Sequence, residues 1–320
     1  MNALEALKAT GTIVVADTGD FTAISVFKPQ DATTNPTLIL NATKLPECAK
    51  LMQIAVDYAK QKGGDVDTQA ENAMDHLLVE FGREILKMIP GRVSTEIDAS
   101  FSFDTVGTIA KAKQIIALYK SMGVPKERVL IKIASTWEGI QAAKELEREG
   151  ICCNLTLMFS LVQAIACAEA EVTLVSPFVA RVLDWYRAVE GQEFPAERNP
   201  GVDSVEKIYN YYRQHGYKTI VMGASFKRVG EVIALAGCDF LTINPIVLKE
   251  LMESSEPVPR KLSLDSAKQH AVPKVSYIDD EAKFRWELFQ ERMAFEKLYE
   301  GIRGFAADGE TLKAQLRAML

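Results

Sequence analysis

The sequence contains few of the residues that build disulfides, zinc sites or histidine-dependent triads. Among its 320 residues are three histidines and five cysteines, and no Cys-x-x-Cys occurs. An odd number of scattered cysteines argues against a disulfide framework and a structural zinc site, and favours a reducing compartment. The cysteines are Cys48, Cys152, Cys153, Cys167 and Cys238. Because no histidine ends a predicted strand, we expect neither a Ser-His-Asp triad nor a histidine-bound metal, although carboxylates alone could still hold one.

Excess positive charge, a long apolar run and a nucleotide-binding glycine motif are also absent. Lysine and arginine number 37 against 43 acidic residues, a net charge of −6, so we expect no broad nucleic-acid surface. Glu5 and Lys8 interrupt the first residues, where a signal peptide would be apolar, and no stretch reaches membrane-spanning length. We therefore expect a cytoplasmic protein that binds neither nucleic acid nor membrane. Neither Gly-x-Gly-x-x-Gly nor a P-loop occurs, so no motif supports nucleotide binding.

Short apolar runs alternate with longer amphipathic patterns along the chain, as in parallel strands joined by helices. The predicted strands are Thr12–Asp17, Asp31–Asn35, Arg92–Asp98, Val129–Ala134, Cys153–Leu157, Val172–Ser176, Thr219–Ala224 and Phe240–Asn244. The predicted helices include Pro46–Gln61, Thr68–Met88, Thr105–Met122, Glu138–Glu149, Ser160–Ala170, Ser204–His215, Val229–Ala236 and Pro245–Met252.

Both a doubly wound sheet and a closed barrel fit this alternation. Polar residues lie at or just beyond the end of every predicted strand, for example Asp17, Lys132 and Ser176. A barrel gathers the carboxyl ends of all eight strands around one mouth, whereas a doubly wound sheet needs polar residues only at its switch point. We therefore favour an α/β fold, a (β/α)8 TIM barrel with additional N-terminal and C-terminal helices.

The last part of the sequence differs in character from the rest. Prolines from Pro257 onward predict a non-helical crossing, and Asp279–Asp308 has the pattern of one or two amphipathic helices. We expect residues 257–320 to wrap around the barrel as part of a single domain that spans residues 1–320.

Lys132 is the most informative residue for chemistry. It lies in the predicted strand Val129–Ala134, where a buried ammonium is costly, so it should meet a carboxylate or lose its proton and act as a nucleophile. A lysine at a strand edge that extends into water is the plainer alternative.

Carboxylates and hydroxyls occupy corresponding positions on other strands. Asp17 ends the first strand. It is either a general acid or base, or a residue that forms a turn or caps a helix, a role that Asp20 could also fill. Ser94, Glu96 and Asp98 share one face, which predicts a wet or catalytic interior or a structural pairing with Lys132. Asn154 and Thr156 alternate with leucines in the same way. An amine, carboxylates and hydroxyl donors together suit Schiff-base chemistry.

Several motifs resemble the transaldolase family, in matching order over nearly the whole chain. They are Val-Val-Ala-Asp-Thr-Gly-Asp (14–20), Lys-Pro-Gln-Asp-Ala-Thr-Thr-Asn-Pro (28–36), Pro-Gly-Arg-Val-Ser-Thr-Glu (90–96), Ile-Lys-Ile-Ala-Ser-Thr-Trp (131–137), Cys-Asn-Leu-Thr-Leu (153–157), Ser-Pro-Phe-Val (176–179), Val-Met-Gly-Ala-Ser-Phe (221–226), Ala-Gly-Cys-Asp (236–239) and Gly-Ile-Arg-Gly-Phe-Ala (301–306). The resemblance implies a class I aldolase-like barrel that transfers a dihydroxyacetone unit between sugar phosphates without metal or organic cofactor. The family's members are often dimers, which makes a homodimer through the C-terminal helices an expectation.

The resemblance also implies roles for individual residues. Lys132 would form the Schiff base, Asp17 would move the proton of the sugar C4 hydroxyl, and Glu96 with Thr156 would position a catalytic water. The remaining implied residues contact substrate: Asn35, Asn154 and Ser176 the hydroxyls, Phe178 the pocket wall, and Arg181 with the Ser225 region the phosphate.

Some positions depart from the family pattern. Lys227, followed by Arg228, stands where the family usually has arginine, so which of the two contacts phosphate is open. Ala180 replaces a common glycine and Ser100 a common arginine. Two alternatives to transaldolase remain: an aldolase that cleaves fructose 6-phosphate and releases the unit to water, and a catalytically silent barrel that serves as a binding protein.

Overall fold

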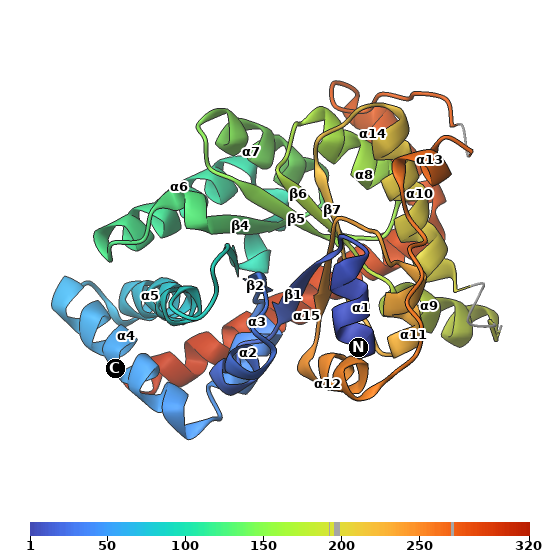
Figure 1. Ribbon diagram of the computed structural model, residues 1–320. Helices are drawn as coiled ribbons and strands as arrows, with labels where there is room; N and C mark the ends of the chain where they lie inside the picture. Colours follow the sequence, from blue (N-terminus) through green and yellow to red (C-terminus); the bar gives the residue numbers. More distant parts are fainter. Residues whose placement is uncertain (192, 195–198, 270–271) are drawn as a thin grey trace.

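The structure, a computed structural model, describes residues 1–191, 193–194, 199–269 and 272–320. Eight parallel strands form a closed barrel in which each strand pairs with the next and the last pairs with the first (Figure 1). The strands are β1 (Ile13–Asp17), β2 (Asp31–Thr33), β3 (Val93–Glu96), β4 (Val129–Ala134), β5 (Cys153–Met158), β6 (Leu174–Pro177), β7 (Ile220–Gly223) and β8 (Phe240–Ile243). The predicted (β/α)8 barrel is confirmed.

Helices follow the strands and cover the outside of the barrel (Figure 1). Those up to β6 are α1 (Ala3–Ala9), α2 (Phe21–Phe27), α3 (Pro36–Ala42), α4 (Ala49–Lys62), α5 (Val66–Leu86), α6 (Thr105–Ser121), α7 (Trp137–Arg148) and α8 (Leu161–Glu169). Those after β6 are α9 (Ala180–Glu190), α10 (Pro200–Gln214), α11 (Val229–Ala234), α12 (Pro245–Glu253), α13 (Leu264–Ala267), α14 (Glu281–Gln290) and α15 (Arg292–Arg317). Short 3-10 turns are η1 (Pro46–Cys48), η2 (Ala99–Phe103) and η3 (Lys126–Arg128).

Two strands, β2 and β3, end two residues earlier than the sequence pattern predicts, because residues that follow them cap helices. β2 ends at Thr33, and the side chain of Asn35 accepts a hydrogen bond from Leu38 N at the start of α3. β3 ends at Glu96, and Asp98 accepts one from Ser100 N at the start of η2. A side-chain oxygen that satisfies a free helical N–H favours a helix start over continued strand. The predictions of strand through Asn35 and Asp98 were therefore wrong.

The barrel interior is built in two chemically different layers. Val15, Leu130, Leu174 and Met222 form a small buried apolar cluster inside the ring. Since side chains alternate across a strand, the residue two places later points the same way. In β1, β4 and β6 these later residues are Asp17, Lys132 and Ser176. An apolar floor therefore lies beneath a polar layer at the carboxyl ends of the strands.

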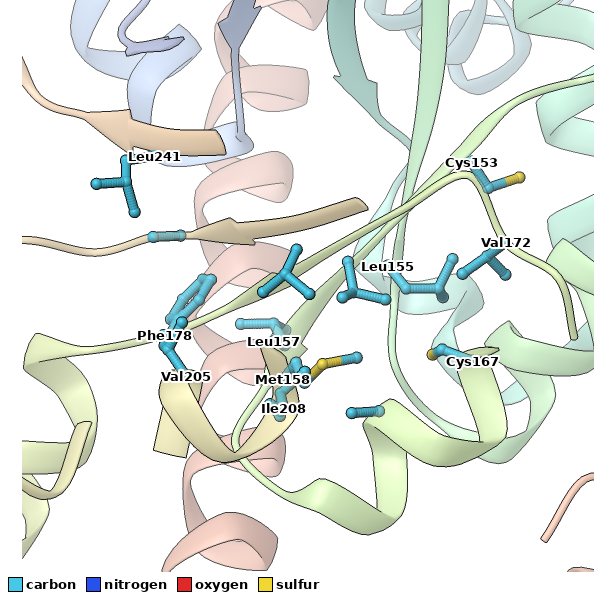
Figure 2. Close-up of a cluster of buried hydrophobic side chains, with 14 of the residues drawn as sticks. Cys153, Leu155, Leu157, Met158, Cys167, Val172, Phe178, Val205, Ile208 and Leu241 are labelled. Atoms are coloured by element: carbon cyan, nitrogen blue, oxygen red, sulfur yellow. The ribbon is translucent and has the colours of Figure 1, made fainter. Parts of the chain in front are cut away.

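The main apolar core fills the space between strands and helices. Figure 2 shows part of it around β5, where Leu155, Leu157 and Met158 lie near Cys167 of α8 and Ile208 of α10. Burial of this kind contributes about 25 cal/mol for each Å² of apolar surface removed from water. None of the helices in the described ranges combines the length and apolar character that a bilayer crossing requires.

The last helix, α15, runs along the barrel and contacts α3, α5, α9 and β5 (Figure 1). Its approach to β5 is close, because a Cβ at Gly301 would lie only 2.6 Å from Leu157 Cδ2. The segment predicted to contain one or two helices contains two, α14 and α15. Helix α15 ends at Arg317, nine residues beyond Asp308, where the prediction ended. This close packing brings α15 to the carboxyl ends of the strands.

Candidate active site

Lys132 lies inside the barrel between two neighbouring strands that carry polar side chains. In the sheet register it lies opposite Glu96 of β3 on one side and Asn154 of β5 on the other. Its side chain is almost fully buried, with Nζ 3.2 Å from Glu96 Oε2 and a hydrogen bond of 3.1 Å to the carbonyl oxygen of Thr34. The amine therefore faces the interior and not the solvent.

Glu96 is the carboxylate that accompanies this amine. Burial raises the pKa of Glu96 above its usual value, and the charge of Lys132 opposes the rise. Despite the short ion-pair distance, Glu96 Oε2 is buried without a well-directed hydrogen-bond donor among the described residues. Thr156 Oγ1, on β5, is also buried without a hydrogen-bond partner among the described residues. Buried polar atoms seldom remain unsatisfied, so these two atoms indicate a place for ordered water or substrate.

Asp17 is held by a chain of hydroxyls. Thr33 Oγ1 donates to Asp17 Oδ1 at 2.8 Å and lies 2.6 Å from Thr242 Oγ1, so Thr242 is the donor to Thr33. Burial raises the pKa of Asp17, and Lys132 again opposes the rise. Asp20, by contrast, caps α2 through hydrogen bonds from Thr22 N and Ala23 N. The two aspartates thus separate into one that faces the cavity and one that caps a helix.

A cavity of about 80 Å³ is lined by Lys132, Asp17 and Thr156, whereas Glu96, which contacts Lys132, is not among its lining residues. Eight of the residues singled out in the sequence line it: Asp17, Asn35, Lys132, Thr156, Ser176, Phe178, Arg181 and Ser225. Asn154 lies beside it, where its Oδ1 accepts from Ser176 Oγ and its Nδ2 donates to Ser94 Oγ. These two hydrogen bonds fix the orientation of the Asn154 amide, which in turn holds the Ser176 hydroxyl in place.

Arg181 supplies positive charge at the cavity wall. Its guanidinium lies over the rings of Phe178 at 5.1 Å and Phe305 at 5.4 Å, and no ion pair to it exists among the described residues. Burial lowers the pKa of Arg181, while Glu96 raises it. A half-buried guanidinium without a salt-bridge partner is a ready site for an anion, because it can donate two parallel hydrogen bonds to phosphate or carboxylate.

Three other candidates are placed outside this group. Lys227 is exposed and bonded to Asp184 at 2.7 Å, and Arg228 is exposed at the start of α11; neither lines the cavity. Asp98, grouped with Glu96 by strand alternation, instead faces Lys313 at 3.6 Å, because β3 has already ended. Of the histidines, His76 lies in α5 and His215 follows α10, while His270 is outside the described residues.

Four cavity residues were not singled out from the sequence as site residues: Thr33, Ala224, Thr242 and Phe305. Thr33 and Thr242 lie near the ends of β2 and β8, and strand-end threonines facing the same way as Asp17 were the available signal. Phe305 comes from α15, where its apolar spacing alone does not single it out, but it lies in the segment Gly-Ile-Arg-Gly-Phe-Ala (301–306) that resembles the family, and that resemblance was the available signal.

Comparisons with known proteins identify relatives over the full length. Residues 14–316 match the family described as Transaldolase/Fructose-6-phosphate aldolase. The chain is 63% identical over 312 residues to a transaldolase of Saccharomyces cerevisiae, covering 97% of this chain and 93% of the relative. It is 59% identical to a transaldolase of Schizosaccharomyces pombe, over 100% of this chain and 99% of that protein. It is 57% identical to a probable transaldolase of Drosophila melanogaster, with 100% and 96% coverage.

Proposed function

The chain belongs to the transaldolase/fructose-6-phosphate aldolase family and is an enzyme of the transaldolase type, and from this premise we propose how its cavity carries out the transfer. The donor is sedoheptulose 7-phosphate or fructose 6-phosphate, and the acceptor is glyceraldehyde 3-phosphate or erythrose 4-phosphate. A dihydroxyacetone unit passes between them while bound to Lys132 as a Schiff base. The observation that carries this proposal is the buried Lys132 amine, 3.2 Å from one carboxylate and in a cavity that contains a second.

Lys132 begins the reaction as the nucleophile. Transfer of a proton to Glu96, which already contacts it, frees the amine to attack the C2 carbonyl of the donor. Loss of water then gives the protonated imine. Glu96 and Thr156 hold that water, which agrees with the two unpartnered oxygen atoms at these side chains.

Asp17 acts in the next step, cleavage of the C3–C4 bond. It accepts the proton of the C4 hydroxyl, the aldehyde product leaves, and the bond electrons move into the imine to form an enamine on Lys132. A carboxyl whose pKa is raised by burial is a better proton acceptor than an ordinary aspartate. The same residue returns the proton when the acceptor aldehyde adds.

Recognition of the substrate is divided between two regions of the cavity. Asn35, Asn154 and Ser176 hold the hydroxyls of the three-carbon unit, and Phe178 forms part of the wall. Arg181 and the region of Ser225 bind the phosphate, which suits the absence of a salt-bridge partner for Arg181 among the described residues. Phosphate binding by Lys227 or Arg228 would require these exposed side chains to turn toward the cavity.

A single experiment tests the mechanism. Borohydride reduction in the presence of fructose 6-phosphate should fix a three-carbon adduct on Lys132, as seen by peptide mass spectrometry. Lys132→Arg, which keeps the charge but cannot form the imine, is the control and should give no adduct. An adduct on another lysine, or none in the unaltered protein, would remove Lys132 from this role.

The family name also includes fructose-6-phosphate aldolases, and product analysis separates the two activities. A transaldolase keeps the dihydroxyacetone unit on the enzyme until an acceptor arrives. Free dihydroxyacetone released at the rate of fructose 6-phosphate consumption, without acceptor, would favour the aldolase.

A homodimer through the C-terminal helices is the proposed assembly. Trp286 and Phe289 of α14 and Phe103 of η2 are each about half exposed and adjoin one groove that also includes Phe295 and Tyr299 of α15. Such an apolar patch is typical of an interface. Light scattering should show a dimer that becomes a monomer in Trp286→Glu, whereas Ile246→Glu, at an exposed site on α12, should remain dimeric. A monomeric unaltered protein would contradict this.

Two further proposals concern the chain as a whole. We expect it to act as one domain across residues 1–320, with 257–320 as the wrapping segment, since α15 contacts elements from both halves of the barrel. We expect a cytoplasmic location, which suits five cysteines that are all free.

A further inference from the structure

A second cavity, of about 90 Å³, adjoins the catalytic one. It lies among α5, η2 and α15, and Glu96 and Phe305 are part of its lining. Phe305 also lines the catalytic cavity, and Glu96 contacts Lys132, which lines that cavity as well. Glu96 and Phe305 thus form the partition between the two spaces.

The second cavity leads from solvent to a buried carboxyl group. Glu71 and Ser100 at its lining are exposed, whereas Pro36, Phe305 and Glu96 are buried. Its volume is enough for a few water molecules, since a water occupies about 30 Å³ of liquid. Glu96 lines this cavity, and its Oε2 lies 3.2 Å from the Lys132 amine. The cavity therefore offers room for water beside the carboxyl group that faces Lys132.

The charges along this cavity do not suit a second phosphate site. Lys111 is bonded to Asp75 at 2.7 Å, and Lys313 lies 3.6 Å from Asp98 and 3.0 Å from Glu310. Each lysine already faces a carboxylate, so an anion would have to displace that partner. A water-filled passage lined by polar groups fits the cavity better.

We propose that this second cavity carries water and protons between the solvent and Glu96 while the sugar fills the catalytic cavity. The inference rests on the proposed Schiff-base mechanism. In that mechanism a water must leave when the imine forms and another must enter when it is hydrolysed, although the bound sugar obstructs the mouth. A separate passage to Glu96 removes that conflict.

The hydrolysis step can be written in full. Water bonds through its oxygen to C2 of the protonated imine and gives one proton to Glu96. That proton passes to the nitrogen, the C2–N bond breaks with its electrons going to nitrogen, and the hydroxyl proton of the new ketone passes to the amine. Lys132 is then an ammonium facing the Glu96 carboxylate, which is the pair present in the structure.

Gly309 of α15 provides a way to block the passage without touching the catalytic residues. It is buried and lines the second cavity, yet a Cβ built on it would meet no atom within 4 Å. Gly309→Leu therefore places a side chain in the open space. Gly304, on the same helix, is exposed and equally unobstructed, so Gly304→Leu is a matched control for the change in composition and helix propensity.

The test measures how often C2 of fructose 6-phosphate exchanges its oxygen with solvent during one imine cycle. The proteins are incubated with this sugar in H₂¹⁸O, and label at C2 is followed by mass spectrometry after subtraction of uncatalysed exchange. The number of imine cycles comes from the rate and amplitude of rapid-quench borohydride trapping. Because the readout is a ratio, a general loss of activity does not change it.

In the unaltered protein and in Gly304→Leu, we expect about one labelled ketose per cycle, since water exchanges with solvent while the imine exists. In Gly309→Leu the ratio should fall by about fivefold or more, because the original oxygen is retained and returns to C2. Gly309→Ala should give an intermediate value, and it replaces the leucine variant if that one does not fold.

The opposing outcomes are distinct. Equal ratios in all variants, or a low ratio in the unaltered protein, would overturn the passage while leaving the Schiff base intact. Failure of borohydride to trap any imine in the unaltered protein would overturn the proposed function and, with it, this inference.

Discussion

Lys132 Nζ and Glu96 Oε2 lie 3.2 Å apart on adjacent strands, each with 4% of its residue surface exposed. Their strands are in direct register, so the pairing is fixed by the sheet as well as by the side chains. A buried ion pair of this kind is costly to desolvate and adds little net stability. A catalytic role therefore explains its presence better than a structural one.

Removing the carboxylate from this pair should slow the steps that involve water. We predict that Glu96→Gln lowers kcat by about 10²- to 10⁴-fold, the usual contribution of a general acid or base. Rapid-quench trapping should show slower imine formation. Asp98→Asn is the matched control, because Asp98 faces Lys313 instead of Lys132, and it should stay within about threefold of the unaltered protein. Normal imine formation in Glu96→Gln would contradict the role of this residue.

The two aspartates of the sequence Asp-Thr-Gly-Asp should have separable effects. Asp17→Ala should still form the imine with fructose 6-phosphate but lose carbon–carbon cleavage, measured as release of glyceraldehyde 3-phosphate. Asp20→Ala should retain kcat and lose about 1 kcal/mol of unfolding free energy, since it removes the cap of α2. Full turnover by Asp17→Ala would exclude Asp17 from proton transfer.

Arg181 should determine affinity for the phosphate group. Arg181→Gln is expected to raise KM for fructose 6-phosphate by about 10- to 150-fold, because this is the size of effect that the loss of a charge-assisted hydrogen bond produces. The KM for the acceptor glyceraldehyde, which has no phosphate, should change far less. Lys227→Gln should have little effect, because that amine is exposed and bonded to Asp184. The reverse ranking of the two variants would move the phosphate site to the start of α11.

His76 should make the fold less stable in mild acid. Burial, with a smaller contribution from Arg83, lowers its pKa from 6.5 to about 4. Between these values the unfolded chain binds a proton that the folded protein does not, so stability falls as the pH drops below 6.5 and the loss levels off below about 4. Glu80, whose Oε1 lies 3.9 Å from His76 Nδ1, favours the protonated ring, so we expect the loss from pH 7 to pH 5 to be at most about 2 kcal/mol.

Urea unfolding of the unaltered protein and of His76→Gln at both pH values isolates that contribution. The variant should lose less stability on acidification than the unaltered protein, by up to the same amount. Parallel losses in the two proteins would show that His76 does not titrate as described. The ring of Tyr58 packs against His76, with the two ring centroids 4.1 Å apart. The substitution removes this packing at both pH values, so the resulting loss of stability cancels when the two pH values are compared.

Much of the site could be predicted because the strands are short and strictly alternating. The apolar residues Val15, Leu130 and Leu174 fix which face of each strand is inward, and that parity places Asp17, Lys132 and Ser176 in one layer. The same parity failed for Asp98, where helix capping ended the strand two residues early. Alternation is reliable only as far as the backbone remains extended.

Contacts between distant segments could not be predicted in this way. Phe305 reaches the cavity because α15 packs closely on β5 through Gly301, and apart from the family resemblance of residues 301–306 the apolar spacing of α15 does not reveal which turn will face the strands. The position of Lys227, outside the cavity, has a similar cause, since its partner Asp184 lies on α9, a distant part of the sequence. Long-range packing, which local sequence does not encode, decided both positions.

The contribution of Phe305 to the cavity also affects when a newly made chain becomes competent. All eight strands are complete at Ile243, well before α15 has been synthesised. A ring that closes on the ribosome would therefore hold Lys132, Glu96 and Asp17 in place while one wall of the pocket is still missing. We therefore expect a newly made chain to reach full activity only after its tail has emerged and docked on the barrel.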